Sequence, residues 1–192
     1  LFPVFCRDFG IKGIWMSVFH SISAFCNAGF DILGTTDHTF VSLTGYSRNI
    51  WLNIVIMLLI ILGGIGFLTW EDFYTNKFKF KRYRMQSKVI LITTAILIIA
   101  PAVFFFACDF GNLPAGKRLL ASVFQSVTTR TAGFNTEDLS LMTEAGKAVM
   151  ILLMLIGGSP SSTAGGMKTT TFAVLILNAL ATFRSREDAG AF

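Results

Sequence analysis

The chain has 192 residues, of which 53% are hydrophobic and 14% are charged, and its formal net charge is +5. Soluble domains have about 25% charged residues, so this chain has too few charges to cover a water-facing globule of its size. The composition therefore excludes a soluble enzyme, a disulfide-stapled secreted module and a nucleic-acid-binding domain as first interpretations. Three stretches contain no charge, residues 49–70, 89–108 and 148–167, and each approaches the roughly 20 apolar residues that span a bilayer. The sequence predicts a multi-pass membrane protein.

The first uncharged segment, residues 13–30, leads through residues 31–48 into an expected inner helix over residues 49–73. Six basic residues with no acidic residue among them follow this helix: Lys77, Lys79, Lys81, Arg82, Arg84 and Lys88. The positive-inside rule places this linker, residues 77–88, in the cytoplasm. The inner helix before the linker must therefore start outside the cell, and residues 31–48 are expected to be extracellular.

The second half of the chain follows the same logic. Residues 89–108 form the expected outer helix, which rises from the cytoplasmic linker to an extracellular segment at residues 109–117. A second inner helix, over about residues 146–183, returns to a cytoplasmic tail at residues 184–192. The plasma membrane is the location that this pattern predicts.

Two shorter uncharged segments, residues 13–30 and 119–129, have both ends on the side that this topology places outside. Such a segment cannot cross the membrane. It is typical of a re-entrant hairpin, in which a half-helix enters the membrane and irregular backbone returns. We expect pore helices over about residues 13–26 and 118–130, each followed by a turn that water or ions must solvate.

The two re-entrant segments resemble each other at a period of about one hundred residues. Val18-Phe19-His20-Ser21 corresponds to Val123-Phe124-Gln125-Ser126, and Asn27-Ala28-Gly29-Phe30-Asp31 corresponds to Thr131-Ala132-Gly133-Phe134-Asn135. The repeated unit is an outer helix, a pore helix with its turn, and an inner helix. Residues 1–76 form one unit without its outer helix, residues 89–183 form a complete one, and the expected turns cover residues 26–31 and 130–135. We interpret the chain as a fragment of a longer protein.

The glycines of these turns suit the chemistry of a cation site. Backbone carbonyls can replace the water around a cation, and glycine lets successive carbonyls turn the same way without a Cβ clash. The half-helices also direct the negative ends of their dipoles at the turns, which favours a cation. A single such glycine more often marks close helix packing, but two corresponding copies favour a filter. The expected filter residues are Cys26, Asn27, Ala28, Gly29, Phe30, Arg130, Thr131, Ala132, Gly133 and Phe134, with K⁺ at the backbone carbonyls near Asn27, Ala28, Thr131 and Ala132.

Arg130 immediately precedes the second turn, and a charge at membrane depth is costly unless it is paired or hydrated. We expect Arg130 to brace the filter electrostatically. The alternative is an arginine that extends to the membrane interface. Glu137 and Asp138 are the expected partners in either case.

The last apolar region, residues 148–183, carries a single charge, Lys168, and as one helix would be about 54 Å long, too long for one straight span. Its interior has the composition of a loop. We expect an intramembrane gating loop made of Gly157, Gly158, Ser159, Pro160, Ser161, Ser162, Thr163, Ala164, Gly165, Gly166 and Lys168. A linker outside the membrane is the alternative, but the apolar flanks are too short to span alone. A phosphate-binding loop is excluded because Met167 separates Gly166 from Lys168.

Three segments, Phe25–Phe30, Thr129–Thr136 and Gly157–Thr169, resemble in this order the motifs of the TrkH/KtrB/HKT potassium transporters, with the KtrB-like branch as the expected one. The resemblance implies four pore-loop repeats around one potassium-channel-like pore, of which this chain would be the second and third. The filter glycine of each repeat would then be Gly29 or Gly133. The loop from Gly157 to Lys168 would be the family's gating loop.

The resemblance implies potassium uptake by a protein that is not an enzyme and has no covalent cofactor. K⁺ would be the transported ion and Na⁺ a candidate coupling ion for symport. A homodimer, a cytoplasmic ring of nucleotide-binding regulatory subunits and membrane lipids are the implied partners, and nucleic acid is not. A non-conducting regulatory or scaffold subunit with the same pore fold stays open as the alternative. An inverted-repeat transporter is disfavoured because both repeats run in the same direction.

Overall fold

The structure is a computed structural model that describes residues 1–183 except residues 36–38, 40 and 78. The expected tail 184–192 and part of the expected extracellular segment 31–48 lie outside the described residues. Every named element in the described part is helical, and one isolated bridge joins Ile156 to Met167. The all-α fold class predicted from the sequence is confirmed.

The first half of the chain contains α1 (Phe2–Phe9), α2 (Lys12–Phe25), the short 3₁₀ helix η1 (Thr44–Tyr46), α3 (Ile50–Ile65) and α4 (Phe67–Asn76). The side chain of Asn49 caps the start of α3 by accepting a hydrogen bond from the amide of Leu52 (3.1 Å). The expectation of one inner helix over residues 49–73 is wrong, because α3 and α4 meet at an angle of 94°.

Gly66 explains this bend. Its φ of +91° is a conformation that glycine adopts without steric cost. A Cβ at this position would lie 2.5 Å from the carbonyl oxygen of Pro160, a residue almost one hundred positions further along the chain. The amide of Phe67, which starts α4, donates to the carbonyl of Ser161 (2.9 Å). The helix therefore bends around a loop that comes from the other half of the chain.

The second half contains η2 (Phe80–Arg82), α5 (Met85–Cys108), α6 (Ala115–Thr128), η3 (Leu139–Leu141), α7 (Glu144–Leu155) and α8 (Thr169–Phe183). The expected linker 77–88 thus contains η2 and the first turn of α5. Among the described residues, α5 is the single helix that is by itself long and apolar enough to cross a membrane. The bent pair of α3 and α4 reaches that length only if both helices are counted as one span, and α8 is a shorter apolar helix.

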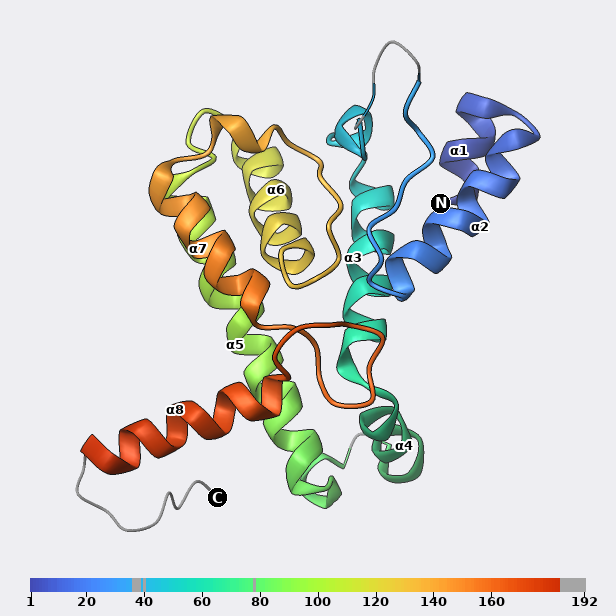
Figure 1. The fold of residues 1–192 in the computed structure, drawn as a ribbon. Coiled ribbons are helices and arrows are strands. Elements are labelled where there is room, and N and C mark those ends of the chain that lie inside the picture. Colours follow the sequence, from blue (N-terminus) through green and yellow to red (C-terminus); the bar gives the residue numbers. More distant parts are fainter. Residues whose placement is uncertain (36–38, 40, 78, 184–192) are drawn as a thin grey trace.

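Figure 1 shows how these elements are arranged. The helix α5 packs against α6 and α7 in its upper part, and α8 runs sideways from its lower part. The helices α2 and α3 pack together on the other side of the molecule, and α6 also contacts α3. The segment between α7 and α8 runs across to the corner between α3 and α4, and the lower ends of α2 and α6 lie above it.

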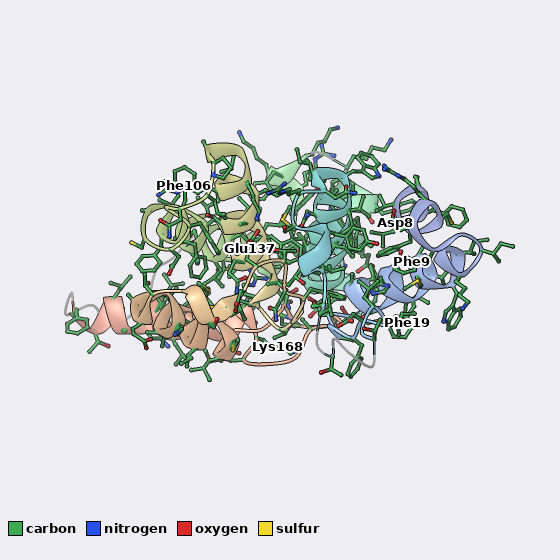
Figure 2. All side chains as sticks on the ribbon, turned by 90° about the horizontal axis from the view of Figure 1, so that it is seen from above. Asp8, Phe9, Phe19, Phe106, Glu137 and Lys168 are labelled. Carbon is green, nitrogen blue, oxygen red and sulfur yellow. The ribbon has the colours of Figure 1, made fainter. Side chains whose placement is uncertain are left out.

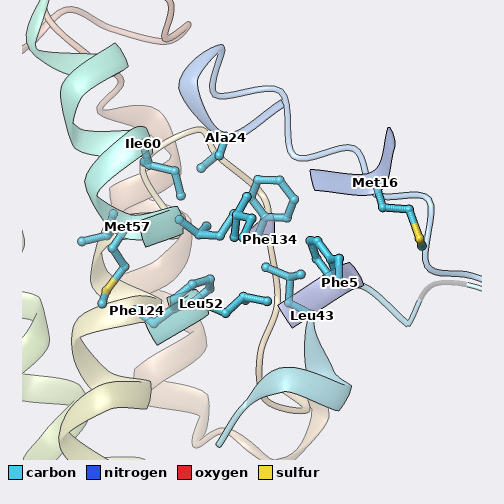
Figure 3. Packing of buried hydrophobic residues seen from close by; sticks show 13 residues of the cluster. Phe5, Met16, Ala24, Leu43, Leu52, Met57, Ile60, Phe124 and Phe134 are labelled. Carbon is cyan, nitrogen blue, oxygen red and sulfur yellow. The ribbon is translucent and has the colours of Figure 1, made fainter. Parts of the chain in front are cut away.

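A buried hydrophobic cluster holds the two halves together (Figure 3). Its first-half members include Phe5, Leu43 and Leu52, and its second-half members include Phe124 and Phe134; all five side chains are fully buried. A second cluster lies within the second half, between α5, α6 and α7, with Phe105, Phe110, Met150 and Leu153 among its members. Burial of large apolar side chains in both clusters fixes the positions of α2 and α6.

A similar tether occurs in each half. The carboxylate of Asp8 at the end of α1 accepts a hydrogen bond from the hydroxyl of Tyr46 (2.8 Å), just before α3. Asp109, which follows α5, accepts from the hydroxyl (2.7 Å) and the amide (2.9 Å) of Thr143, just before α7. Figure 2 shows Asp8 from above, beside Phe9. Burial, and next the hydrogen bond and charge of Asp8, raise the pKa of Tyr46, which keeps this hydroxyl protonated.

Candidate functional site

The turns that follow α2 and α6 meet at their glycines. A Cβ on Gly29 would lie 2.0 Å from the carbonyl oxygen of Ala132, and one on Gly133 would lie 3.7 Å from the Cα of Gly29. Both glycines have positive φ, +71° and +85°. The structure therefore brings together the two turns that the sequence singled out, and it leaves no space for a side chain on Gly29.

Each turn alternates the sign of φ. Asn27 (φ 52°) and Thr131 (φ 78°) lie two residues before the glycines and also have positive φ, whereas Ala28 and Ala132 between them do not. Such alternation turns successive amides to one side of the backbone and successive carbonyls to the other. The amide of Ala28 donates to the carbonyl of Ser23 (2.9 Å) and that of Ala132 to the carbonyl of Thr128 (3.0 Å). The amides thus point back at the ends of the pore helices.

The carbonyls of the turns are left without partners. Within the described residues, the carbonyl oxygens of Asn27, Ala28, Thr131 and Ala132 accept no hydrogen bond. An unpaired carbonyl is unusual in a folded protein, because burial without a partner is costly. A backbone carbonyl without a hydrogen-bond partner can accept either water or a cation.

A hydroxyl in the last turn of each pore helix fixes the far end of each turn. Ser23 donates to the carbonyl of Phe30 (2.8 Å), and Thr128 donates to the carbonyl of Phe134 (2.7 Å). We did not predict these two residues from the sequence. The repeat contains the signal, since each stands five residues after the valine that opens the repeated motif.

The remaining predicted filter residues differ in burial. Ala132 and Phe134 are fully buried in the cluster of Figure 3, whereas Cys26 is exposed and Phe30 keeps 70% of its surface accessible. Phe30 and Phe134 occupy corresponding positions in the two motifs, so this phenylalanine anchors the second turn in the core but not the first.

The expected partners of Arg130 are wrong. Glu137 pairs with Lys117 (2.8 Å), and the exposed Asp138 accepts hydrogen bonds from Ser140. Arg130 is buried, and its guanidinium donates to the carbonyl of Thr94 on α5 (3.4 Å), while its Nε has no partner among the described residues. The side chain is therefore held inside the protein by a backbone carbonyl, and the alternative in which it extends to the membrane interface is not what the structure shows.

The predicted gating segment runs between α7 and α8 and attaches to the end of α3. The amide of Ser159 donates to the carbonyl of Gly64 (3.0 Å), and its hydroxyl donates to the same carbonyl (2.7 Å) and to that of Ile65. The amide of Thr163 donates to the carbonyl of Gly63 (3.2 Å). The last carbonyls of a helix have no partner inside the helix, so the loop caps α3.

The same loop reaches the first filter turn. The hydroxyl of Thr163 donates to the carbonyl of Phe25 (2.7 Å), the last residue of α2, and accepts from the side-chain amide of Asn27 (3.1 Å). Gly63 makes this approach possible, because a Cβ there would lie 1.9 Å from the Phe25 carbonyl oxygen and 2.8 Å from the Thr163 hydroxyl.

The ends of the loop are held close together. The amide of Gly157 donates to the carbonyl of Met167 (2.9 Å), and Lys168 donates from its Nζ to the carbonyl of Ala164 (2.8 Å). A Cβ on Gly157 would lie 1.6 Å from the carbonyl oxygen of Gly165, so the two ends of the loop can come this close only with glycine at position 157. Inside the loop, the hydroxyl of Ser162 accepts from the amide of Ala164 (3.3 Å).

Little space remains between the first filter turn and the loop. A void of about 10 Å³ lies between the two turns, α3 and the loop. Its walls include Asn27 of the first turn, Arg130 beside the second turn, Gly64 of α3, and Gly158 and Ala164 of the loop. A void needs at least about 10–15 Å³ to hold one water molecule. This void therefore has room for about one water molecule at most. No group of three or more His, Cys, Asp or Glu in the described part of the chain could hold a metal ion.

The fold and these turns define a class, a helical membrane protein built around short helices that end at facing carbonyl-lined turns. Residues 4–190 match the TrkH family of cation transport proteins. The chain belongs to this family, as its motifs predicted, and a membrane location follows.

Three relatives illustrate the similarity. The chain is 42% identical to the potassium/sodium uptake protein NtpJ of Enterococcus hirae, over 98% of this chain and 42% of that protein. It is 37% identical to the Ktr system potassium uptake protein B of Bacillus subtilis, over 92% of this chain and 40% of that protein. The crystal structure of the potassium transporter TrkH from Vibrio parahaemolyticus shares the fold, with a TM-score of 0.70 at 18% identity, over 88% of this chain and 36% of that one. The chain thus spans about two fifths of the length of these relatives.

Proposed function

We propose that the chain forms two adjacent pore-loop repeats of a KtrB-like potassium uptake protein. The carbonyls of Asn27, Ala28, Thr131 and Ala132 would replace part of the hydration shell of K⁺, and the corresponding turns of two further repeats would complete the filter. The observation that carries the proposal is that two turns with alternating φ, each with free carbonyls, meet at Gly29 and Gly133. The names of the relatives, which are potassium or potassium/sodium uptake proteins, support K⁺ as the substrate and Na⁺ as a coupling ion.

The loop from Gly157 to Lys168 would act as an intramembrane gate. Its support is that the loop borders the small void beneath the first turn and is held to the ends of α2 and α3 by hydrogen bonds. Hydroxyls and amides that leave these partners can bond to water instead, so a displaced loop is energetically accessible.

The same proposal includes the topology and the partners. The basic linker 77–88 would face the cytoplasm, residues 31–48 and 109–117 would face outward, and the pore would work as a homodimer under the control of a cytoplasmic nucleotide-binding ring. The coverage of about two fifths of the relatives' length leaves room for two further repeats.

Substitution of a filter glycine in the full-length transporter tests the filter. Gly133→Ser has room for its Cβ but places a side chain at a φ of +85° beside the carbonyls. Gly116→Ser, in the first turn of α6, is the matched control, because no heavy atom lies within 4 Å of its added Cβ. Reconstituted protein should show a reduced preference for K⁺ over Na⁺ with Gly133→Ser and a normal preference with Gly116→Ser.

The yield of folded protein must be measured alongside. If both substitutions leave the K⁺/Na⁺ preference unchanged while the protein folds, Gly133 does not line the filter. Absence of any flux from folded wild-type protein would favour the alternative of a non-conducting subunit.

A further inference from the structure

An apolar cavity lies at the lower end of the molecule, away from the filter turns. Its volume is about 450 Å³, within the range of about 300–1,000 Å³ that holds small molecules. It opens between the α3–α4 pair and α5, and its walls are Leu62, Ile65, Trp70, Phe73, Tyr83 and Leu91. These walls are apolar, so an apolar group is the occupant that the cavity favours.

The polar atoms of the aromatic walls are already used inside the protein. The indole of Trp70 donates to the carbonyl of Leu62 (3.0 Å), and the hydroxyl of Tyr83 donates to the carbonyl of Lys77. The rings therefore present their apolar faces to the cavity. The hydroxyl of Thr69, also in the wall, is buried and has no hydrogen-bond partner among the described residues.

Residues 71–88, which include the wall residues Phe73, Phe80 and Tyr83 and are here called the rim, are strongly basic. Residues 71–88 carry six basic residues and two acidic ones, a net charge of +4. Arg84 pairs with both acids, Glu71 and Asp72. The other basic residues make no ion pair within the described part of the chain, and Lys79, Lys81 and Arg82 are exposed.

The rim and the cavity are built from the same short segment. Phe80 lines the cavity and is flanked in sequence by Lys79 and Lys81, and Arg82 precedes the wall residue Tyr83. The ammonium of Lys88, on the first turn of α5, donates to the carbonyl of Lys81 (3.0 Å), which brings a further positive charge over this segment. An apolar cavity with a cationic rim is complementary to a molecule with an apolar chain and an anionic head.

We propose that this cavity binds an anionic phospholipid, with part of an acyl chain between α4 and α5 and the phosphate at Lys79, Lys81 and Arg82. The inference rests on the membrane topology proposed above, in which the basic linker faces the anionic cytoplasmic leaflet, and it does not depend on conduction. A zwitterionic lipid has no net charge to match the rim, so binding should discriminate between head groups.

Brominated lipids test this directly, because Trp70 lies in the wall and bromine quenches tryptophan fluorescence at contact. Full-length protein is reconstituted with brominated phosphatidylglycerol or brominated phosphatidylcholine, and the signal of Trp70 is the difference between the wild type and Trp70→Phe. We expect phosphatidylglycerol to quench Trp70 at a lower lipid fraction than phosphatidylcholine. The double variant Lys79→Gln/Arg82→Gln should weaken this preference by about tenfold or more at low salt.

Matched controls separate the site from general effects. Lys12→Gln/Arg48→Gln removes the same charge from exposed positions in the other part of the chain and should keep the preference. Leu91→Phe, which fills part of the cavity, should reduce quenching by both lipids, whereas Ile99→Phe at an exposed position of α5 should not.

Three results would overturn the proposal. Equal quenching by the two lipids in the wild type would show that the charged rim does not distinguish anionic from zwitterionic head groups. No quenching of Trp70 by either lipid would show that protein, from another segment or a second copy, covers the cavity. Loss of the phosphatidylglycerol preference in excess inorganic phosphate at constant ionic strength would show a phosphate site rather than a lipid site. None of these readouts involves K⁺ flux, so they stand apart from a failure of the proposed function.

Discussion

The hydroxyl of Thr163 accepts a hydrogen bond from the side-chain amide of Asn27 at 3.1 Å, although the two residues are 136 positions apart. Asn27 belongs to the first filter turn and Thr163 to the loop between α7 and α8. The same hydroxyl donates to the carbonyl of Phe25 at 2.7 Å. One side chain therefore links the proposed filter of one repeat to the proposed gate of the next.

The first prediction concerns this link. Thr163→Val keeps the shape of the side chain and removes both hydrogen bonds, each worth about 0.5–1.5 kcal/mol. A loss of about 1.4 kcal/mol from the closed state shifts a two-state equilibrium about tenfold. We expect higher basal K⁺ flux per folded molecule and an unchanged K⁺/Na⁺ preference, measured by ion uptake into proteoliposomes.

Two controls belong to that experiment. Thr163→Ser keeps the hydroxyl and should behave almost as the wild type. Thr171→Val makes the same change at an exposed position of α8 and should have no effect. Equal flux from Thr163→Val and Thr163→Ser would show that the hydroxyl does not hold the loop.

The second prediction uses two neighbouring glycines of α3. A Cβ on Gly63 would lie 1.9 Å from the Phe25 carbonyl oxygen, whereas the nearest atom to a Cβ on Gly64, the Asn27 Nδ2, is 4.0 Å away. Gly63→Ala should destabilise the protein by about 1–3 kcal/mol or more, the usual cost of overpacking. Gly64→Ala should be close to neutral. Thermal unfolding of the two purified variants checks this, and equal melting temperatures would contradict the close approach of α3 to the end of α2.

Much of the architecture could be predicted because it is local. The apolar stretch of α5 has the length and composition of a span, the glycines of the turns recur at a fixed period, and the Gly, Ser and Thr content of residues 157–166 is that of a loop. The bend at Gly66 could not be predicted in this way. Its neighbours Gly63, Gly64 and Ile65 read as the interior of an apolar helix, and the bend depends on Pro160 and Ser161, which are distant in sequence.

The predicted partners of Arg130 were wrong for a related reason. Glu137 and Asp138 were expected as partners because they are the acidic residues nearest to Arg130 in the sequence. In the fold, the arginine donates to the backbone carbonyl of Thr94 on α5, and Glu137 forms an ion pair with Lys117. Which carboxylate a cation reaches depends on helix packing, and α6 packs against the upper part of α5 (Figure 1). The residue types of the turns could be predicted from the sequence. The contacts that hold the turns in place could be found only from the structure.

The third prediction tests the tether at the top of the second half. Asp109 accepts two hydrogen bonds from Thr143, the residue that caps α7. Asp109→Ala leaves the amide and hydroxyl of Thr143 without this acceptor and should cost about 1–3 kcal/mol. Asp138→Ala is the control, because Asp138 is exposed and its hydrogen bonds are confined to Ser140, two residues further along. Thermal unfolding should show a clear loss for Asp109→Ala alone, and an equal loss in both variants would contradict the role of the tether.

The last prediction concerns the gate itself. Deletion of residues 161–164 removes Thr163 and the carbonyl of Ser161 that Phe67 uses, while Ser159 keeps its bonds to the end of α3. A shortened loop cannot fill the space beneath the first turn, so K⁺ flux should rise and its dependence on any regulatory partner should weaken. Selectivity should change little, because the proposed filter lies at the turns of Gly29 and Gly133. Since the deletion already lacks the hydroxyl link, adding Asn27→Asp to it should change flux less than Asn27→Asp does in the full loop. Flux per folded molecule decides the matter: a fall after the deletion would mean that residues 161–164 only support the bend between α3 and α4 and do not block the pore.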